Sequence, residues 1–265
     1  DLYGAVADTL IDVYEPGLLD TIHHVTIRDG NLENTLSGGV LREVGLTRDD
    51  LAAGKLGEVL PASDPANGAV WYLYPPRTGE REVHAAFLAQ GYERLFRRLY
   101  DHPRYKLWLD LYVRPGVRLG TAQAVNGDFA DGAAGWTLPP TGTALAPDDA
   151  GNHLTLTGPL TASYDLAAQG EGIYTLGVET ETVQDADTVQ VTLTCLAADG
   201  DVLATGSSEV PADPAQPGTW QTRRTAAWCP TATSTARLTL GNAGTGEIAY
   251  RHATLDFLPV EQRGA

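Results

Sequence analysis

Three aspartates, Asp128, Asp131 and Asp256, have the chemistry of ligands for a hard cation. Calcium in proteins takes roughly six to eight oxygen ligands, typically from carboxylates and main-chain carbonyls. Asp128 and Asp131 precede a series of predicted strands and Asp256 lies in the last one, so one calcium ion would join the two ends of a β domain. The alternative is that Asp128 and Asp131 only form turns, because short polar side chains bond to nearby backbone groups there.

Aromatic rings are the second kind of group that could do chemistry. A flat ring facing solvent stacks on a sugar, while polar groups beside it bind the sugar hydroxyls. The second half of the chain offers six rings: Trp136, Tyr164, Tyr174, Trp220, Trp228 and Tyr250. Our candidate glycan-binding residues are Tyr164, Tyr174 and Trp228. Trp228 could instead pack on its neighbour Cys229.

The two cysteines, Cys195 and Cys229, both lie in the second half. They fall on predicted strands or strand ends that could be neighbours, and a disulfide there would fit an extracellular or particle-exposed protein. The alternative is a pair of buried free thiols, which are ordinary core residues. No suitable histidine pattern accompanies them, so they do not predict a zinc site.

The first half offers weaker candidates for chemistry. His23 and His24 are adjacent and would point in two directions on a helix, so we interpret them as surface or packed residues. Asp110 lies inside an apolar strand, either as an acid in an apolar setting or, more often for such a residue, as an outward-facing side chain. No Ser-His-Asp set, carboxylate pair or nucleotide-binding motif stands out in the sequence. We therefore predict that the chain is not an enzyme.

Composition and charge limit the partners. The chain has 265 residues and a net charge of -16, so its overall field repels a nucleic-acid backbone. Its one basic cluster falls on a predicted helix, and we interpret it as a solvated or intersubunit face. The cluster consists of Arg94, Arg97, Arg98 and Arg104. No apolar run reaches the roughly 18 residues that a membrane span needs.

The second half has the pattern of an all-β domain. Apolar and β-branched residues alternate between turn signals, which is typical of a sandwich. Thr188 to Cys195 alternates almost without a break and leads through a strong hairpin turn, residues 198–201, into Val202 to Thr205. Roughly nine strands at regular spacing predict a jelly-roll β-sandwich over residues 121–265. Eight of these runs are 153–157, 162–166, 172–181, 188–195, 202–205, 220–228, 236–240 and 248–258.

The first half mixes helical and strand patterns, which predicts an α+β domain over residues 1–120 that serves anchoring or oligomerisation. Helical spacing within residues 1–24 is broken at 15–17, with a further turn expected at 18–23, and the best helix is expected from Glu80 to Asp101. Strands are expected at 25–27, 69–74 and 105–113. The apolar stripe of the long helix consists of Val83, Phe87, Leu88, Tyr92, Leu95, Phe96 and Leu99.

One stretch resembles a known family. Residues 126–129 are Asn-Gly-Asp-Phe, followed by Asp131-Gly132 and by Gly135-Trp136. This order resembles the opening of carbohydrate-binding modules of the jelly-roll, galactose-binding-like type. The likeness continues at 219–222, 234–240 and 246–250, and covers roughly residues 122–259. It implies the fold more firmly than the ligand, because such modules bind glycans, metals or other proteins, or only space domains apart.

The resemblance also bears on individual residues. It implies core positions for Trp136 and Trp220. In the family, an acidic pair usually precedes the last hydrophobic residues, and that acid often helps to hold a structural calcium. This chain has Arg251-His252 there instead, with Asp256 four residues on. The departure weakens the expectation of calcium.

These observations predict a non-catalytic structural or adhesion protein of a large extracellular or virus-particle assembly. The first domain would contact further copies or other subunits, and the jelly roll would face outward and could bind glycans. Calcium is the one cofactor that we consider. The alternative is a glycan-directed enzyme or a secreted lectin with an accessory carbohydrate-binding module. A first half of about 120 residues without a carboxylate pair argues against the enzyme.

Overall fold

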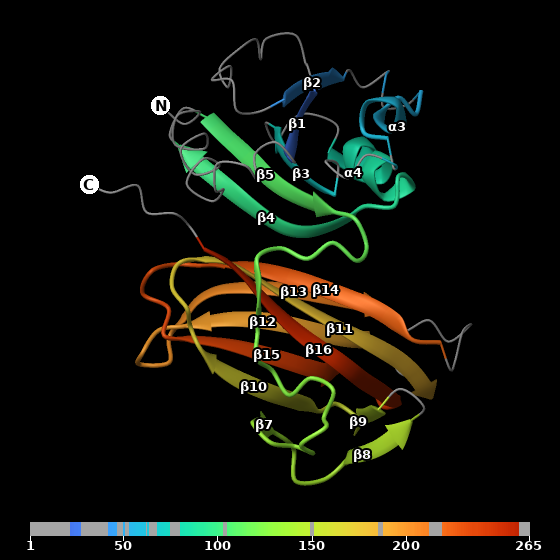
Figure 1. The fold of residues 1–265 in the computed structure, drawn as a ribbon, viewed down its shortest axis with the longest axis vertical. Coiled ribbons are helices and arrows are strands. Elements are labelled where there is room, and N and C mark those ends of the chain that lie inside the picture. The colour runs from blue at the N-terminus through green and yellow to red at the C-terminus, as the bar shows by residue number, and fades with distance from the viewer. Residues whose placement is uncertain are drawn as a thin grey trace. The chain divides into compact units, whose positions relative to one another are not determined.

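The computed structural model describes residues 22–27, 42–46, 50, 53–61, 63, 68–74, 80–102, 105–148, 151–184, 188–211 and 219–259. The chain divides into two compact units, one of residues 1–118 with 260–265 and one of Leu119–Pro259. Figure 1 shows both along the chain. Within the described parts, no helix is long and apolar enough to cross a membrane.

The first unit contains a five-stranded mixed sheet in the order β2-β1-β3-β5-β4. β1 pairs in parallel with β2 and β3, whereas β5 pairs antiparallel with β3 and β4. Two short helices accompany the sheet, and the ring of Phe87 in α4 stacks on Tyr112 of β5 with centroids 4.0 Å apart. The elements are β1 (Ile22–Ile27), β2 (Arg42–Leu46), α3 (Leu56–Val59), β3 (Ala69–Tyr74), α4 (Glu80–Ala89), β4 (Glu93–His102) and β5 (Tyr105–Val113).

The long helix predicted from Glu80 to Asp101 is wrong beyond Ala89. Gly91 has a φ of 78°, a left-handed conformation that glycine adopts at little cost. The amide of Gly91 donates to the carbonyl of Leu88, and that of Tyr92 to the carbonyl of Phe87, which together form a Schellman ending. The apolar residues that follow belong to strand β4. Of the expected stripe, Leu88 and Leu99 are exposed.

The helical turn expected at 18–23 is also wrong where the structure describes the chain. Ile22 begins strand β1, so His23 and His24 have strand backbones and the expected short strand at 25–27 is the end of a longer one. Residues 1–21 lie outside the described part of the chain. The strands expected at 69–74 and 105–113 are present as β3 and β5.

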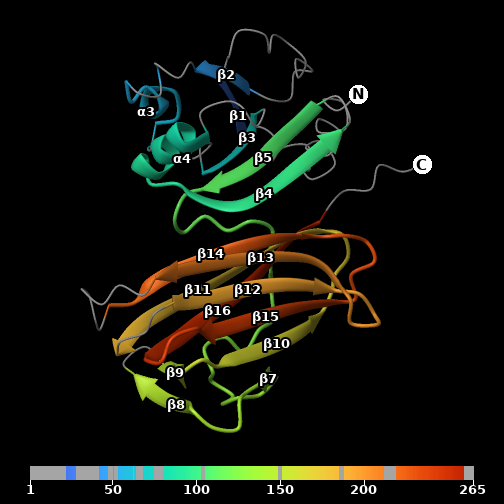
Figure 2. The same ribbon diagram turned by 180° about the vertical axis from the view of Figure 1, so that it is seen from behind.

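The second unit is an antiparallel β-sandwich, seen from two sides in Figures 1 and 2. One sheet has the order β13-β12-β15-β10-β7 and the other β14-β11-β16-β9-β8, with β6 also paired to β16. Its strands are β6 (Thr121–Gln123), β7 (Trp136–Thr137), β8 (Thr143–Asp148), β9 (Gly151–Thr157), β10 (Thr161–Ala167), β11 (Gly172–Gln184), β12 (Thr188–Leu196), β13 (Val202–Pro211), β14 (Gln221–Cys229), β15 (Thr235–Asn242) and β16 (Glu247–Pro259).

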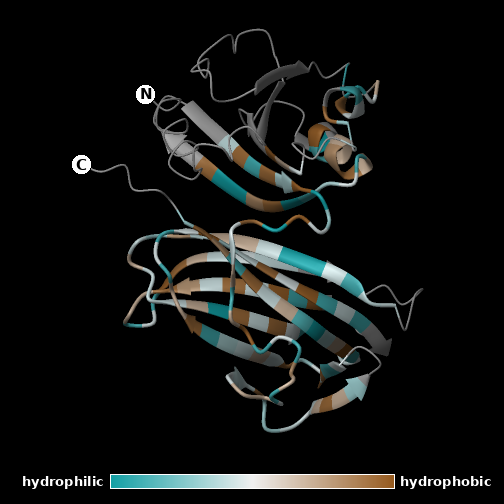
Figure 3. Cartoon of the chain, in the orientation of Figure 1, coloured by the Kyte–Doolittle hydropathy of each residue, from teal (hydrophilic) through white to brown (hydrophobic). Residues whose placement is uncertain are grey.

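The strand order is that of a jelly roll. Lettering β9 to β16 as B to I gives neighbours B-I-D-G in one sheet and C-H-E-F in the other, the arrangement produced by two interlocked Greek keys. Figure 3 shows apolar and polar residues alternating along these strands. The apolar set of both sheets points inward and forms one continuous core. Alternation in the sequence thus predicts this half well.

Candidate ligand-binding face

A β-bulge in the sheet β14-β11-β16-β9-β8 creates the most distinctive polar site. On β11, Tyr174, Leu176 and Val178 belong to the core, so Glu179 lies on the outer face. Opposite, Gly177 pairs with Thr254 and Glu179 pairs with Arg251, so β16 carries one extra residue between these pairs. His252 lies in the extra segment and has a φ of 51°. The bulge therefore interrupts the alternation of β16 beside Glu179.

The consequence is that two successive residues reach one carboxylate. Nε of Arg251 donates to Oε2 of Glu179 over 2.7 Å, and Nδ1 of His252 lies 3.2 Å from the same oxygen. In a regular strand, neighbouring side chains would point to opposite faces. The side chains of Arg251, Glu179 and His252 are 16%, 33% and 40% exposed, so the group is partly sheltered and still open to solvent.

Two rings extend this group across the sheet. The guanidinium of Arg251 lies over the indole of Trp220, 4.0 Å from the ring centre. The ring of His153 on β9 meets the same indole edge-on, with centroids 6.0 Å apart. We refer to these five residues as the Trp220 cluster: His153, Glu179, Trp220, Arg251 and His252. Its members come from β9, β11, β16 and the residue that precedes β14.

The carboxylate at the centre of the cluster is held in its ionised form. Burial raises the pKa of Glu179, but the hydrogen bonds and charges of Arg251 and His252 outweigh burial, so the net pKa lies below its ordinary value. An ionised carboxylate only accepts hydrogen bonds. The cluster therefore combines a charged acceptor, a guanidinium donor, imidazole rings and an indole on one partly exposed surface.

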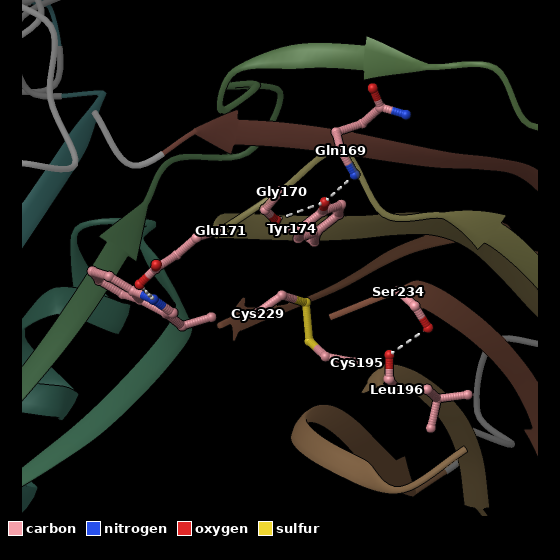
Figure 4. The surroundings of a disulfide bond; sticks show 9 residues. Gln169, Gly170, Glu171, Tyr174, Cys195, Leu196, Cys229 and Ser234 are labelled. Carbon is pink, nitrogen blue, oxygen red and sulfur yellow. Dashed lines mark hydrogen bonds between the residues drawn. A yellow bond between two sulfur atoms is a disulfide. The ribbon is translucent and has the colours of Figure 1, made fainter. Parts of the chain in front are cut away.

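The sequence-predicted glycan residues lie elsewhere. Tyr174 is wrong as a solvent-facing platform, because it is only 1% exposed and packs in the core. Its hydroxyl accepts from the amide of Gln169 and donates to the carbonyl of Gly170, as Figure 4 shows. Burial raises the pKa of Tyr174. Its position on β11 belongs to the inward set of an alternating strand.

Tyr164 and Trp228 are half-buried, and neither joins Tyr174 in a common surface. The ring of Tyr164 meets Trp136 edge-on at 5.3 Å, at the margin of the core. Nε1 of Trp228 lies 3.5 Å from Oε1 of Glu171, and the other carboxylate oxygen, Oε2, accepts a hydrogen bond from Thr231. Trp136 is a core residue, whereas Trp220 is only half-buried and belongs to the cluster described above.

The predicted calcium ligands are not gathered. Asp128 is exposed and its side chain accepts from the amide of Ala130, while Asp131 is exposed in the same loop. Asp256 is only 4% exposed, on β16 between β11 and β6. Among the described residues, no group of three or more His, Cys, Asp or Glu side chains is placed to hold a metal ion. The three aspartates do not form such a group, and calcium binding stays a prediction.

The motif that opens the second half has an architectural role. The side-chain amide of Asn126 donates to the carbonyls of Gly132 and Ala134, and its carbonyl accepts from the amide of Asp131. The backbone carbonyl of Asn126 accepts from Nε1 of Trp136 at 2.9 Å. Phe129, fully buried, fills the core between these turns. These hydrogen bonds and the buried ring fix the conformation of the loop at residues 126–136.

A disulfide joins Cys195 of β12 to Cys229 of β14, with Cα atoms 5.5 Å apart. These strands belong to different sheets, so the bond crosses the sandwich core, as Figure 4 shows. Both cysteines are fully buried. A covalent link between the sheets is typical of proteins that fold in an oxidising environment.

The basic cluster of the first half is not a freely solvated face. Asp110 is only 1% exposed, and Arg94 and Arg97 of β4 lie 3.5 Å and 3.3 Å from its oxygens. Arg97 also stacks over Trp108 at 4.1 Å. A buried carboxylate requires such partners, so the two arginines offset the cost of burying Asp110, which does not face solvent. Arg98 is exposed, and Arg104 lies outside the described residues.

Comparisons with known proteins were made for the whole chain. No family model and no curated protein matches it. Solved structures do match, and several of them are carbohydrate-binding modules with a jelly-roll fold, over about half of this chain. A family 16 module is 17% identical and covers 49% of this chain and 96% of its own, with a TM-score of 0.40. The xylan-binding CBM22-1 of Paenibacillus barcinonensis Xyn10C is 14% identical and covers 54% and 99%, with a TM-score of 0.42.

Another similar structure is the enzymatically active domain of tailspike protein 4 of bacteriophage CBA120, at 16% identity and a TM-score of 0.41. This chain spans only 21% of that domain, and 29% and 27% of two larger glycoside-hydrolase structures. Likenesses of this size describe a similarity over half of the chain and identify no ligand or activity for it.

Sequence reasoning missed most of the Trp220 cluster. Arg251-His252 stood out only as a departure from the family pattern, and Trp220 was assigned to the core. Glu179 was one acid within an alternating strand, and His153 was the first residue of another. The usable signal was a basic pair where alternation of apolar residues breaks between Tyr250 and Ala253, because such a break is typical of a bulge.

Proposed function

We propose that the second unit is a non-catalytic glycan-binding module whose ligand lies on the Trp220 cluster. The observation that carries this proposal is the gathering of an indole, a guanidinium, two imidazoles and an ionised carboxylate on one partly exposed sheet face. Planar rings offer the apolar surface on which a sugar ring stacks, and the polar groups bind hydroxyls at its edge.

The charge of the molecule favours neutral glycans. Within the cluster, the carboxylate of Glu179 offsets the guanidinium of Arg251, so the site has little net charge of its own. The chain as a whole carries a net charge of -16, which repels polyanions such as acidic polysaccharides. A neutral polysaccharide needs no charge partner and uses the stacking surface and hydrogen bonds directly.

The test is affinity electrophoresis of the intact chain in gels that contain xylan, β-1,4-galactan or mixed-linkage β-glucan. At least one of these should retard the wild-type protein, and Trp220→Ala should weaken that retardation by roughly tenfold in apparent Kd. Asp165→Ala is the matched control, because Asp165 pairs with Arg237 on β10 and β15 of the other sheet. Wild-type mobility unchanged in all three gels would overturn the proposal.

We infer further that the protein works outside the cell or on a virus particle, as a component of a larger assembly. The inter-sheet disulfide supports an oxidising compartment. The first unit has its own sheet and helices and is compact by itself. We assign to it the contacts with further copies or other subunits, and to the second unit the binding of glycans. Light scattering coupled to size exclusion tests this: a defined oligomer is expected, and a monomer at micromolar concentration would count against self-assembly.

A further inference from the structure

His252 has an unusual backbone conformation within the bulge of β16. Among the described residues, only Phe129 and His252 are non-glycine residues with positive φ, 52° and 51°. Phe129 is fully buried, so its ring in the core accounts for its backbone. The side chain of His252 is 40% exposed, whereas the next residue, Ala253, is buried and its amide donates to the carbonyl of Gly127. Strain of this kind tends to persist where it presents a side chain for function.

The contact with Glu179 fixes the chemistry of the imidazole. Nδ1 of His252 lies 3.2 Å from Oε2 of Glu179, and an ionised carboxylate can only accept a hydrogen bond. Nδ1 therefore carries a proton that it donates to this carboxylate, and when the imidazole is neutral Nε2 is an acceptor. In a regular strand the side chain of His252 would point into the sandwich. The bulge turns it to the outer face, where Glu179 orients its imidazole.

We propose that His252 is a specificity-determining residue of the glycan site, whose Nε2 accepts a hydrogen bond from a sugar hydroxyl. This inference rests on the glycan-binding function proposed above. Arg251 and Glu179 position the imidazole, and Trp220 supplies the stacking surface beside it. The bulge places Arg251 and His252 on the same face, which a regular strand would not do.

The test separates the imidazole from the backbone that holds it. In His252→Gly the left-handed backbone remains accessible and the imidazole is lost. The apparent Kd for the polysaccharide that retards the wild type most, among xylan, β-1,4-galactan and mixed-linkage β-glucan, should rise about tenfold, while the melting temperature stays within about 3 °C of wild type. His252→Asn, which also tolerates positive φ and retains an acceptor, should recover part of the binding.

Each outcome decides the question. Wild-type binding by His252→Gly, together with weak binding by Trp220→Ala, would overturn the role of His252 and leave the proposed function standing. Wild-type binding by both variants, or wild-type mobility unchanged in every gel, would overturn the proposed function itself. Loss of binding in His252→Gly together with a large fall in melting temperature would assign His252 to the fold and overturn the proposal.

Discussion

At the scale of single residues, hydrogen bonds to carboxylates lower carboxyl pKa values and so make stability depend on pH in the acid range. On the sheet face opposite the Trp220 cluster, Nε and Nη2 of Arg237 form a fork with the two oxygens of Asp165, each 2.7 Å long. These hydrogen bonds hold the pKa of Asp165 below its ordinary value of 3.8, against the opposing effect of burial. Because both side chains are nearly half exposed, the stabilisation is modest.

The pH dependence follows from the sign of that shift. Since the folded pKa of Asp165 is lower than the unfolded pKa, its contribution is fully present above about pH 4 and is lost as pH falls through the folded pKa. Asp165→Asn should therefore lower stability by less than about 1 kcal/mol near neutral pH and flatten the loss of stability below about pH 4. Melting temperatures measured from pH 2.5 to 6 test this, and parallel curves for both proteins would contradict it.

At the scale of elements, β-bulges and helix endings determine where the structure departs from the apolar pattern of the sequence. Alternation predicted the jelly-roll strands because each has one face in the core. The Trp220 cluster was missed because a bulge shifts the side-chain alternation by one residue, and only the break between Tyr250 and Ala253 marks it. Another register shift, between Arg94 and Phe96 of β4, accompanies the pairing of two arginines with Asp110. In both places two basic side chains share one carboxylate.

The predicted helix over 80–101 failed for a local reason. Apolar residues continue at helical spacing past Ala89, but one glycine in a left-handed conformation ends the helix and starts β4. A Cβ at Gly91 would meet no atom within 4 Å, so substitution there changes only the backbone energy. Gly91→Ala should destabilise the protein by about 1–2 kcal/mol, and Gly91→Asn by less, because asparagine tolerates this conformation better. Urea unfolding of the two variants measures the difference, and equal midpoints would contradict the assigned ending.

At the scale of the whole molecule, the second unit relies on a core that spans two sheets and on one covalent bond between them. Half of the chain folds as a sandwich whose inner residues come from both sheets. The disulfide ties β12 of one sheet to β14 of the other across 34 residues of sequence. Cross-linking two sheets chiefly limits the unfolded chain, which can otherwise separate them.

The disulfide should therefore matter for stability and little for binding. For a loop of this length, loop-closure entropy gives a stabilisation of about 4 kcal/mol. The double variant Cys195→Ala, Cys229→Ala should lower the calorimetric melting transition of the second unit. It should leave the affinity for a retarding polysaccharide near wild type below that transition, because neither cysteine belongs to the Trp220 cluster. A variant that melts like wild type would show that core packing alone sustains the sandwich, and a variant that stays folded yet loses binding would show that the disulfide shapes the ligand face.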